Sequence, residues 1–181
     1  MSVPVPQPAG EPSAKPLPRV QVHTDGGAAP NPGIGAWAAV LQYGGHAWEI
    51  SGAVPATTNN RMELQAAIQA LRALNRPCAV EIHTDSDYVR QGITSWIHGW
   101  KRNGWRTSAK EPVKNRDLWV ELDELATRHH IEWRWLKGHA GHRWNERCDE
   151  LATTAIDRLR RTHSPSQLRE AMAEFKRSGI G

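Results

Sequence analysis

Long hydrophobic runs are absent from this 181-residue sequence. No stretch approaches the roughly 18 consecutive apolar residues that mark a membrane-spanning helix, so we expect no membrane association. The first 18 residues, MSVPVPQPAGEPSAKPLP, also lack the apolar core of a secretion signal. We therefore expect a cytoplasmic protein.

Cysteine is scarce as well, since the chain has only Cys78 and Cys148. Their spacing matches neither a disulfide framework nor a zinc site, which excludes a disulfide-stapled fold and a cysteine-based metal centre. We interpret both as ordinary reduced thiols of the cytoplasm. The sequence also contains no internal repeat.

The residues that are present have the composition of a soluble globular chain, with 39% hydrophobic and 23% charged residues. The formal net charge is +4, but it is unevenly distributed. Residues 96–116 hold six basic residues against Glu111 alone, residues 157–181 hold six against three acidic ones, and the remainder is acidic. A compact basic segment beside an acidic remainder indicates a polyanionic partner near a carboxylate site.

The chain divides into three regions. Residues 1–18 contain six prolines and cannot pack, so we expect a disordered or polyproline-like tail. Residues 19–158 carry regular hydrophobic patterns and are enough for one domain with its own core. Residues 159–181 form a basic tail that is either a short helix or disordered.

Apolar alternation and short apolar runs predict strands at 19–25, 36–43, 46–54, 79–85 and 130–136. Tight turns join the first three into an antiparallel meander, and a helix leads into the fourth, which therefore runs parallel to the first. Helical spacing predicts helices at 57–74, 86–100, 116–129 and 143–161, the second broken near Gly92 or Thr94. The fold class is α/β, with a mixed five-stranded sheet, three antiparallel strands plus two parallel, flanked by helices.

Four acidic residues lie where acids are structurally unfavourable: Asp25, Glu63, Asp85 and Asp149. Asp25 and Asp85 each end a strand, in the contexts HTDG and HTDS, so their carboxylates should emerge at one sheet edge. Strand-end Asx turns are the structural alternative for both. Glu63 falls in the first turn of a predicted helix, where it is equally well a capping-box partner of Asn60. Asp149 lies one turn into a later helix and, considered alone, would be a solvated acid.

Four carboxylates brought together in one fold repel one another unless a cation binds. Oxygen ligands from Asp and Glu suit Mg²⁺ or Mn²⁺ rather than zinc. A pair of such ions can activate water and stabilise the leaving oxygen in phosphodiester cleavage. The sequence therefore raises the hypothesis of a two-metal site, whose condition is that the four side chains converge.

Six segments resemble, in order, the successive motifs of bacterial ribonuclease HI: HTDGGAAPNPGIGAWAAVL, TTNNRMELQAAIQAL, IHTDSDYVRQGI, WIHGWKRNGWRT, PVKNRDLW and KGHAGHRWNERCDELA. The resemblance implies the ribonuclease H-like fold, with residues 19–158 as the catalytic domain. It implies an endonuclease that hydrolyses the RNA strand of an RNA–DNA hybrid, leaving 5′-phosphate and 3′-hydroxyl ends. Two Mg²⁺ ions per site would serve as cofactor. Separately, the sequence shows no additional apolar helix face that could mediate self-association, so we expect a monomer.

By this resemblance Asp25, Glu63, Asp85 and Asp149 correspond to the metal-binding carboxylates, and Asp25 would touch both ions. His139, in the loop KGHAGH, corresponds to a mobile histidine that assists proton transfer or product release. The glycines of that loop permit such movement. Without the resemblance, His139 would be interpreted as an ordinary loop histidine.

The resemblance also implies how a hybrid is bound. Asn31, Asn59 and Asn60 would read the RNA minor groove, where the 2′-hydroxyls distinguish RNA from DNA. Thr58 and Asn115 would hold a phosphate of the DNA strand. A basic protrusion would grip the DNA strand through Trp96, Trp100, Lys101, Arg102, Trp105 and Arg106. The structural alternatives are capping roles for the asparagines and core packing for the tryptophans, at least one of which we expect in the core.

The sequence departs from the family pattern at a few positions. Ala56 stands where some relatives have an arginine, Asp87 replaces a common glutamine, and Asn103 and Glu111 make the protrusion less basic. These changes bear on affinity and metal optimum rather than on the reaction. Two other functions compete: a resolvase- or transposase-like DNA nuclease, disfavoured by the asparagine cluster, and a non-catalytic binding module, disfavoured because all four carboxylates are present.

Overall fold

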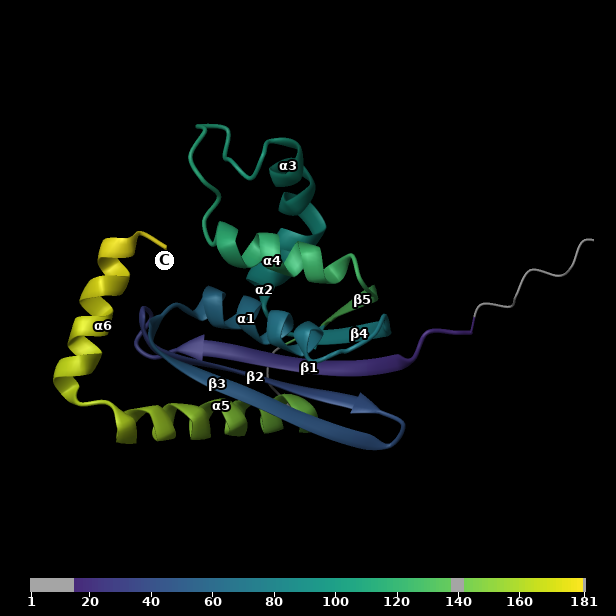
Figure 1. The fold of residues 1–181 in the computed structure, drawn as a ribbon, viewed down its shortest axis with the longest axis horizontal. Coiled ribbons are helices and arrows are strands. Elements are labelled where there is room, and N and C mark those ends of the chain that lie inside the picture. The colour runs from purple at the N-terminus through teal and green to yellow at the C-terminus, as the bar shows by residue number, and fades with distance from the viewer. Residues whose placement is uncertain (1–14, 138–141, 181) are drawn as a thin grey trace, which may run out of the picture.

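The computed structural model describes residues 15–137 and 142–180. Its centre is a five-stranded sheet in the order β3-β2-β1-β4-β5 (Figure 1). The strands are β1 (Arg19–Ala28), β2 (Gly33–Tyr43), β3 (His46–Thr57), β4 (Ala79–Thr84) and β5 (His130–Trp135). β1, β2 and β3 pair antiparallel, and β4 pairs parallel with both β1 and β5. The predicted fold class, meander and parallel crossover are confirmed.

β1 is longer than the predicted strand. It pairs with β2 as far as Ala28, so Asp25 lies inside the strand and the predicted strand end at this residue is wrong. The glycine pair that follows indicated a turn, but glycine also occurs in strands where another backbone approaches closely. β3 likewise continues past residue 54 to Thr57, because its pairing with β2 extends to Gly33.

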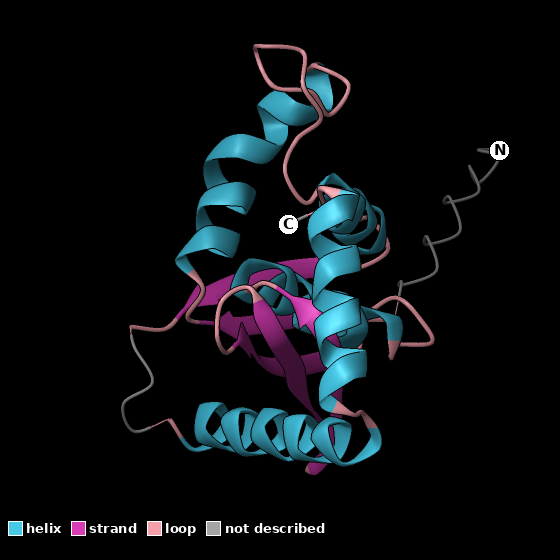
Figure 2. Cartoon of the chain, turned by 90° about the vertical axis from the view of Figure 1, so that its left-hand side faces the viewer, coloured by secondary structure: helices cyan, strands magenta, loops and turns pink. Residues whose placement is uncertain are grey.

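Helices cover both faces of the sheet. They are α1 (Asn59–Arg72), α2 (Asp87–Gln91), α3 (Ile97–Arg102), α4 (Arg116–Ala126), α5 (Arg143–Thr162) and α6 (Pro165–Ser178). α1 and α4 lie on one face, and α5 runs along the opposite face (Figures 1 and 2). The π-helical turn η1 (Gly92–Trp96) joins α2 to α3, which confirms the predicted break in this segment.

α1 starts directly after β3, and its N-cap is Thr58. The Thr58 hydroxyl accepts a hydrogen bond from the backbone N–H of Arg61 at 3.3 Å. Glu63 is therefore the fifth helical residue and lies in the second turn, so its predicted first-turn position is wrong. The alternative of a capping box between Glu63 and Asn60 fails for the same reason, because Asn60 is inside the helix rather than at its cap.

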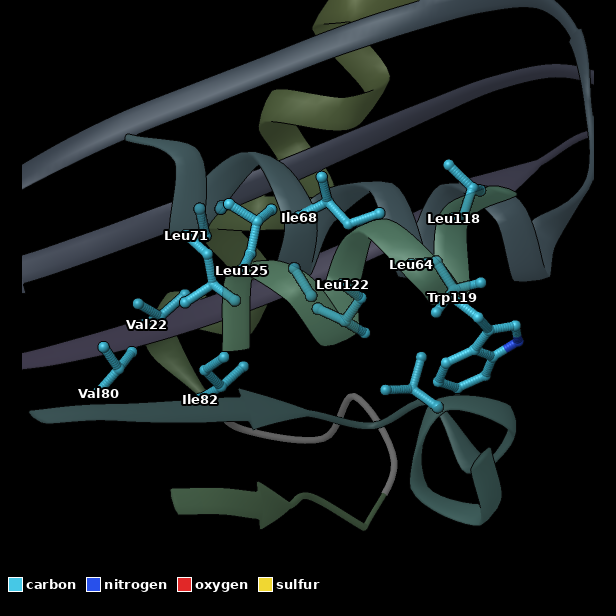
Figure 3. Close-up of a cluster of buried hydrophobic side chains, with 14 of the residues drawn as sticks. Val22, Leu64, Ile68, Leu71, Val80, Ile82, Leu118, Trp119, Leu122 and Leu125 are labelled. Carbon is cyan, nitrogen blue, oxygen red and sulfur yellow. The ribbon is translucent and has the colours of Figure 1, made fainter. Parts of the chain in front are cut away.

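The two faces of the sheet bury very different amounts of apolar surface. Toward α1 and α4 lies the main core, whose largest fully buried side chains are Trp119, Leu64, Ile68, Leu71, Ile82 and Leu122 (Figure 3). Toward α5 the buried cluster consists of Ala38, Val40 and Cys148, with Trp144, Leu151 and Ala152 partly buried around it. Extensive burial thus fixes α1 and α4, while a small patch holds α5.

The C-terminal region is helical and follows directly on the domain. α5 extends to Thr162, beyond residue 158, and α6 follows after a short connection. Of the two alternatives for this region, the structure contains the helix. Within residues 15–137 and 142–180, no helix is both long and apolar enough to cross a membrane.

Candidate active site and nucleic-acid interface

Gly26 brings Asp25 of β1 close to Glu63 of α1. A Cβ atom on Gly26 would lie 2.7 Å from the backbone nitrogen of Glu63, and closer still to the Met62 carbonyl carbon. Only glycine fits at this point, because the helix backbone lies directly on the strand. The residue beside Asp25 therefore touches the turn of α1 that carries Glu63.

Ser86 connects the same glutamate to the end of β4. The Ser86 hydroxyl donates a short hydrogen bond to Oε2 of Glu63. It also accepts from the backbone N–H of Val89 at 3.1 Å, which makes Ser86 the N-cap of α2. Since Ser86 follows Asp85 directly, this bond ties the Asp85 segment to α1. Ser86 was not among the residues predicted for the site, although a serine at the start of a helix after a strand is a recognisable capping signal.

The register of the parallel strands places Asp25 and Asp85 at the same level of the sheet. His23 of β1 pairs with His83 of β4, and each aspartate follows two residues later. The two aspartates therefore lie at one level of the sheet, as the matching HTD segments indicated, although Asp25 is inside β1 and Asp85 follows the end of β4. Glu63 lies against the neighbours of both aspartates, so three of the four expected carboxylates come from adjoining segments.

The fourth carboxylate, Asp149, comes from α5 on the opposite face. Its neighbour Cys148 is fully buried and donates its thiol to the backbone oxygen of His23 at 3.3 Å. Burial, and after it the negative charge of Asp25, raise the pKa of the Cys148 thiol to about 12. α5 therefore packs against β1 near His23, and Asp149 is the next residue of α5 after Cys148.

Two histidines precede the strand aspartates. The rings of His23 and His83 stack with their centroids 4.4 Å apart. Burial, and after it the nearby His83 ring, lower the pKa of His23 to about 4. Nε2 of His83 lies 2.7 Å from Oε1 of Glu81. His23 is thus neutral near pH 7 and adds no positive charge beside the carboxylates.

No three His, Cys, Asp or Glu side chains are gathered into a group that could hold a metal ion, among residues 15–137 and 142–180. The backbone segments that carry Asp25, Glu63 and Asp85 nevertheless adjoin one another. His139 lies outside the described residues.

The asparagines expected to read RNA lie at the junction of β1, α1 and the connection between β1 and β2. Oδ1 of Asn59 accepts a hydrogen bond from the backbone N–H of Ala28 at 2.6 Å. The backbone N–H of Asn59 donates to Oδ1 of Asn31 at 3.1 Å. These hydrogen bonds give Asn31 and Asn59 a structural role, which was the alternative to reading RNA. They also fix the positions of the two side chains.

Asn115 is the N-cap residue of α4, with a left-handed φ of 58°, and it is buried. Its Nδ2 donates to the Tyr88 hydroxyl at 3.1 Å, and its Oδ1 accepts from Nη1 of Arg61 at 3.3 Å. Arg61 also binds both carboxylate oxygens of Asp117, at 2.9 and 2.7 Å, which lowers the pKa of Asp117. The pair of Arg61 and Asp117 therefore holds Asn115 in place, a contact that sequence spacing could not reveal.

A cavity of about 390 Å³ joins several of the expected substrate residues. Asn31, Thr58, Asn60 and Asn115 line it, although they come from three separate parts of the chain. The two residues expected to hold a DNA-strand phosphate, Thr58 and Asn115, thus face one space together.

The basic protrusion contains regular structure. Lys101 and Arg102 belong to the last turn of α3, and Arg106 pairs with Pro112 in an isolated bridge. Nζ of Lys101 lies 3.2 Å from a carboxylate oxygen of Asp123. At least one of the three tryptophans was expected in the core: Trp100 and Trp105 are partly buried and pack against the main core, and Trp96 is 37% exposed.

The chain is similar to known proteins over most of its length. The family model described as RNase H matches residues 18–157. Ribonuclease H of Phenylobacterium zucineum is 61% identical over 139 residues, which cover 77% of this chain and 91% of that protein. Ribonuclease HI of Caulobacter vibrioides is 59% identical over 139 residues, covering 77% and 93% respectively.

A solved structure with the same fold is LC9-RNase H1, described as a type 1 RNase H with the type 2 active-site motif. It matches with a TM-score of 0.70 and 34% identity, over 80% of this chain and 75% of that one. Fold, sequence and family model agree across the region that carries β1 to α5. The chain belongs to the RNase H family.

Proposed function

We propose that this protein is an endonuclease that hydrolyses the RNA strand of RNA–DNA hybrids, at the sheet edge where β1, β4 and α1 meet. Water attacks the phosphorus, the bond to the 3′-oxygen breaks, and the products carry 5′-phosphate and 3′-hydroxyl ends. The observation that carries the proposal is the double contact of α1. Its Glu63 turn lies on Gly26, next to Asp25, and Glu63 accepts from Ser86, next to Asp85.

Asp25, Glu63, Asp85 and Asp149 form the donor set of the proposed site. They offer carboxylate oxygens and no sulfur or nitrogen, which fits Mg²⁺ and also Mn²⁺. Two such ions, when bound, supply Lewis-acid stabilisation for the attacking and leaving oxygens. The chain contributes the placement: β1 and β4 set two aspartates at one level, and Ser86 fixes the carboxylate of Glu63.

Substrate choice rests on the sugars of the hybrid. Asn31, Asn59 and Asn60 are the residues we assign to the 2′-hydroxyls, which only the RNA strand carries. Thr58 and Asn115 hold a DNA-strand phosphate in the cavity that they share. His139 is assigned to proton transfer or product release.

Contacts outside this centre would supply affinity. Trp96, Trp100, Lys101, Arg102, Trp105 and Arg106 are assigned to the DNA strand backbone. Such contacts are salt-sensitive and carry little base preference. A cytoplasmic location and a monomeric state are also parts of the proposal.

One cleavage assay separates the competing functions. An RNA–DNA hybrid, an RNA duplex and a DNA duplex of one sequence are incubated with the protein and Mg²⁺. We expect cleavage of the RNA strand in the hybrid alone, with 3′-hydroxyl ends that a polymerase can extend. Cutting of DNA would instead identify a resolvase-like nuclease, and binding without cleavage would identify a non-catalytic module.

A further inference from the structure

The last helix of the chain ends at the cavity that we assign to a DNA-strand phosphate. Phe175, Lys176 and Gly179 line this cavity together with Thr58 and Asn115. Both views show α6 rising from the end of α5 toward the first turns of α1 and α4 (Figures 1 and 2). The RNase H family model ends at residue 157, so α6 is an addition to the family domain.

The sequence of α6 favours both the formation of this helix and its packing on the domain. Ser164 and Gln167 form a capping box, and Pro165 occupies the first helical position. The partly buried residues follow helical spacing and make one apolar face: Leu168, Ala171, Met172 and Phe175. This helix packs against β3. Because the partly buried residues extend to Phe175, the packing of this face also sets the place of the adjacent Lys176.

The chemistry of the cavity suits an anion. Lys114, in the turn before α4, and Lys176 of α6 contribute positive charge, and Thr58, Asn60 and Asn115 contribute hydroxyl and amide groups. None of the described residues that line it carries a carboxylate. Thr58 and Asn115 are also the N-cap residues of α1 and α4, where the helix dipoles favour negative charge.

We propose that α6 completes the phosphate pocket, and that Lys176 binds a phosphate of the DNA strand opposite Thr58 and Asn115. The inference rests on the proposed function, since it names a further substrate-binding residue for the same reaction. Lys176 is exposed, so its ammonium group can reach a bound backbone without unfolding any part of the core.

The test compares two charge-removing variants of α6 in the full chain. Lys176→Gln removes the proposed contact, and Arg169→Gln removes one positive charge from an exposed residue of the same helix that does not line the cavity. For Lys176→Gln we expect KM for the hybrid to rise about three- to tenfold, with kcat unchanged. The slope of log kcat/KM against log salt should fall by about 0.9, the amount for one lost phosphate contact. Arg169→Gln should match the unaltered protein in both.

A second measurement locates the contact. A hybrid whose DNA strand carries one neutral methylphosphonate is assayed with the linkage moved along the strand. In the unaltered protein one position should weaken binding, and in Lys176→Gln the same position should cause no further loss. Equal effects at every position in both proteins would remove the DNA phosphate from the proposal.

Two results would overturn the inference while the proposed function stands. One is that both variants cleave the hybrid with the KM and the salt slope of the unaltered protein. The other is a gain in kcat/KM for Lys176→Gln, which would make α6 a cover over the pocket rather than part of it. Absence of hybrid cleavage by the unaltered protein would overturn the proposed function itself, so the two failures are distinct.

Discussion

The two faces of the sheet contribute differently to this protein. The face covered by α1 and α4 holds nearly all of the fully buried side chains, including Trp119 and Leu122. The face covered by α5 has a buried cluster of Ala38, Val40 and Cys148, and an exposed ion pair helps to attach the helix. Yet α5 supplies Asp149, one of the four proposed carboxylates. The comparison indicates that one face stabilises the scaffold, while the other carries a functional group although it buries little apolar surface.

The largest effect is expected from Asp25→Asn. This aspartate is assigned to both ions, so its loss should lower kcat on the order of 10³-fold, the equivalent of several kcal/mol of metal stabilisation. Hybrid affinity should stay within a few-fold, because the phosphate contacts are elsewhere. Single-turnover cleavage at saturating Mg²⁺ and a separate binding assay check both parts. Near-normal turnover would remove Asp25 from the mechanism, and Glu124→Gln, an exposed acid of α4, is the matched control.

Truncating one leucine on each face tests the difference in packing. Leu122→Ala opens a cavity in the main core and should cost about 3 kcal/mol of unfolding free energy. Leu151→Ala on α5 removes a partly buried side chain and should cost about 1 kcal/mol. Urea titrations of both variants supply the two values. Equal losses would mean that the two faces contribute alike to stability, contrary to the comparison.

The basic protrusion should affect binding without affecting turnover. Replacing Lys101, Arg102 and Arg106 with glutamine should raise KM about tenfold and reduce the salt slope by up to about 3. The reduction falls short of this limit if the ion pair between Lys101 and Asp123 persists in the complex. Kinetics at a series of salt concentrations measure it. A matched control replaces Arg158, Arg160 and Arg161 of α5, and an unchanged slope in the protrusion variant would exclude phosphate contacts there.

The smallest effect is expected at the ion pair that attaches α5 to β3. Arg147 binds both carboxylate oxygens of Glu49, at 2.9 and 2.8 Å, and this contact lowers the pKa of Glu49 from its ordinary 4.5. The folded state therefore binds the proton less tightly than the unfolded state, so the pair stabilises above pH 4.5 and loses its effect as pH falls through the folded pKa. Glu49→Gln should melt slightly below the unaltered protein at pH 7.

That difference in melting temperature should shrink in acid and in high salt, because the pair is exposed and screened. Thermal melts of Glu49→Gln, Arg147→Gln and the double variant isolate the pair. A difference that persists at low pH would show that Glu49 acts through packing rather than through its charge.

Local patterns in the sequence were sufficient for most elements of the fold. The alternation at Val20, Val22 and Thr24 predicted β1, and the spacing of Leu64, Ile68 and Leu71 predicted the buried face of α1. Such patterns report which side of an element is buried. They do not report where a pairing stops, which is why the end of β1 was misplaced at Asp25.

The candidate site was predicted to a different extent. Matching HTD segments were enough to place Asp25 and Asp85 at one level of the sheet, because the parallel strands pair His23 with His83. The position of Glu63 within its helix was wrong, since the N-cap depends on where β3 ends. The hydrogen bond between Ser86 and Glu63 joins residues that are 23 positions apart in the chain, and no local sequence pattern predicts a contact over that separation.

The sequence by itself determined the order of strands and helices, the buried face of each and the chemical types available to the site. These follow from side-chain periodicity and from backbone preferences, which act over a few residues. Only the tertiary structure decided that Gly26 lies against the Glu63 turn of α1, and that Lys176 lines one cavity with Thr58 and Asn115. Those contacts depend on how packed elements approach each other, because close packing, not local sequence, fixes the distances between distant segments.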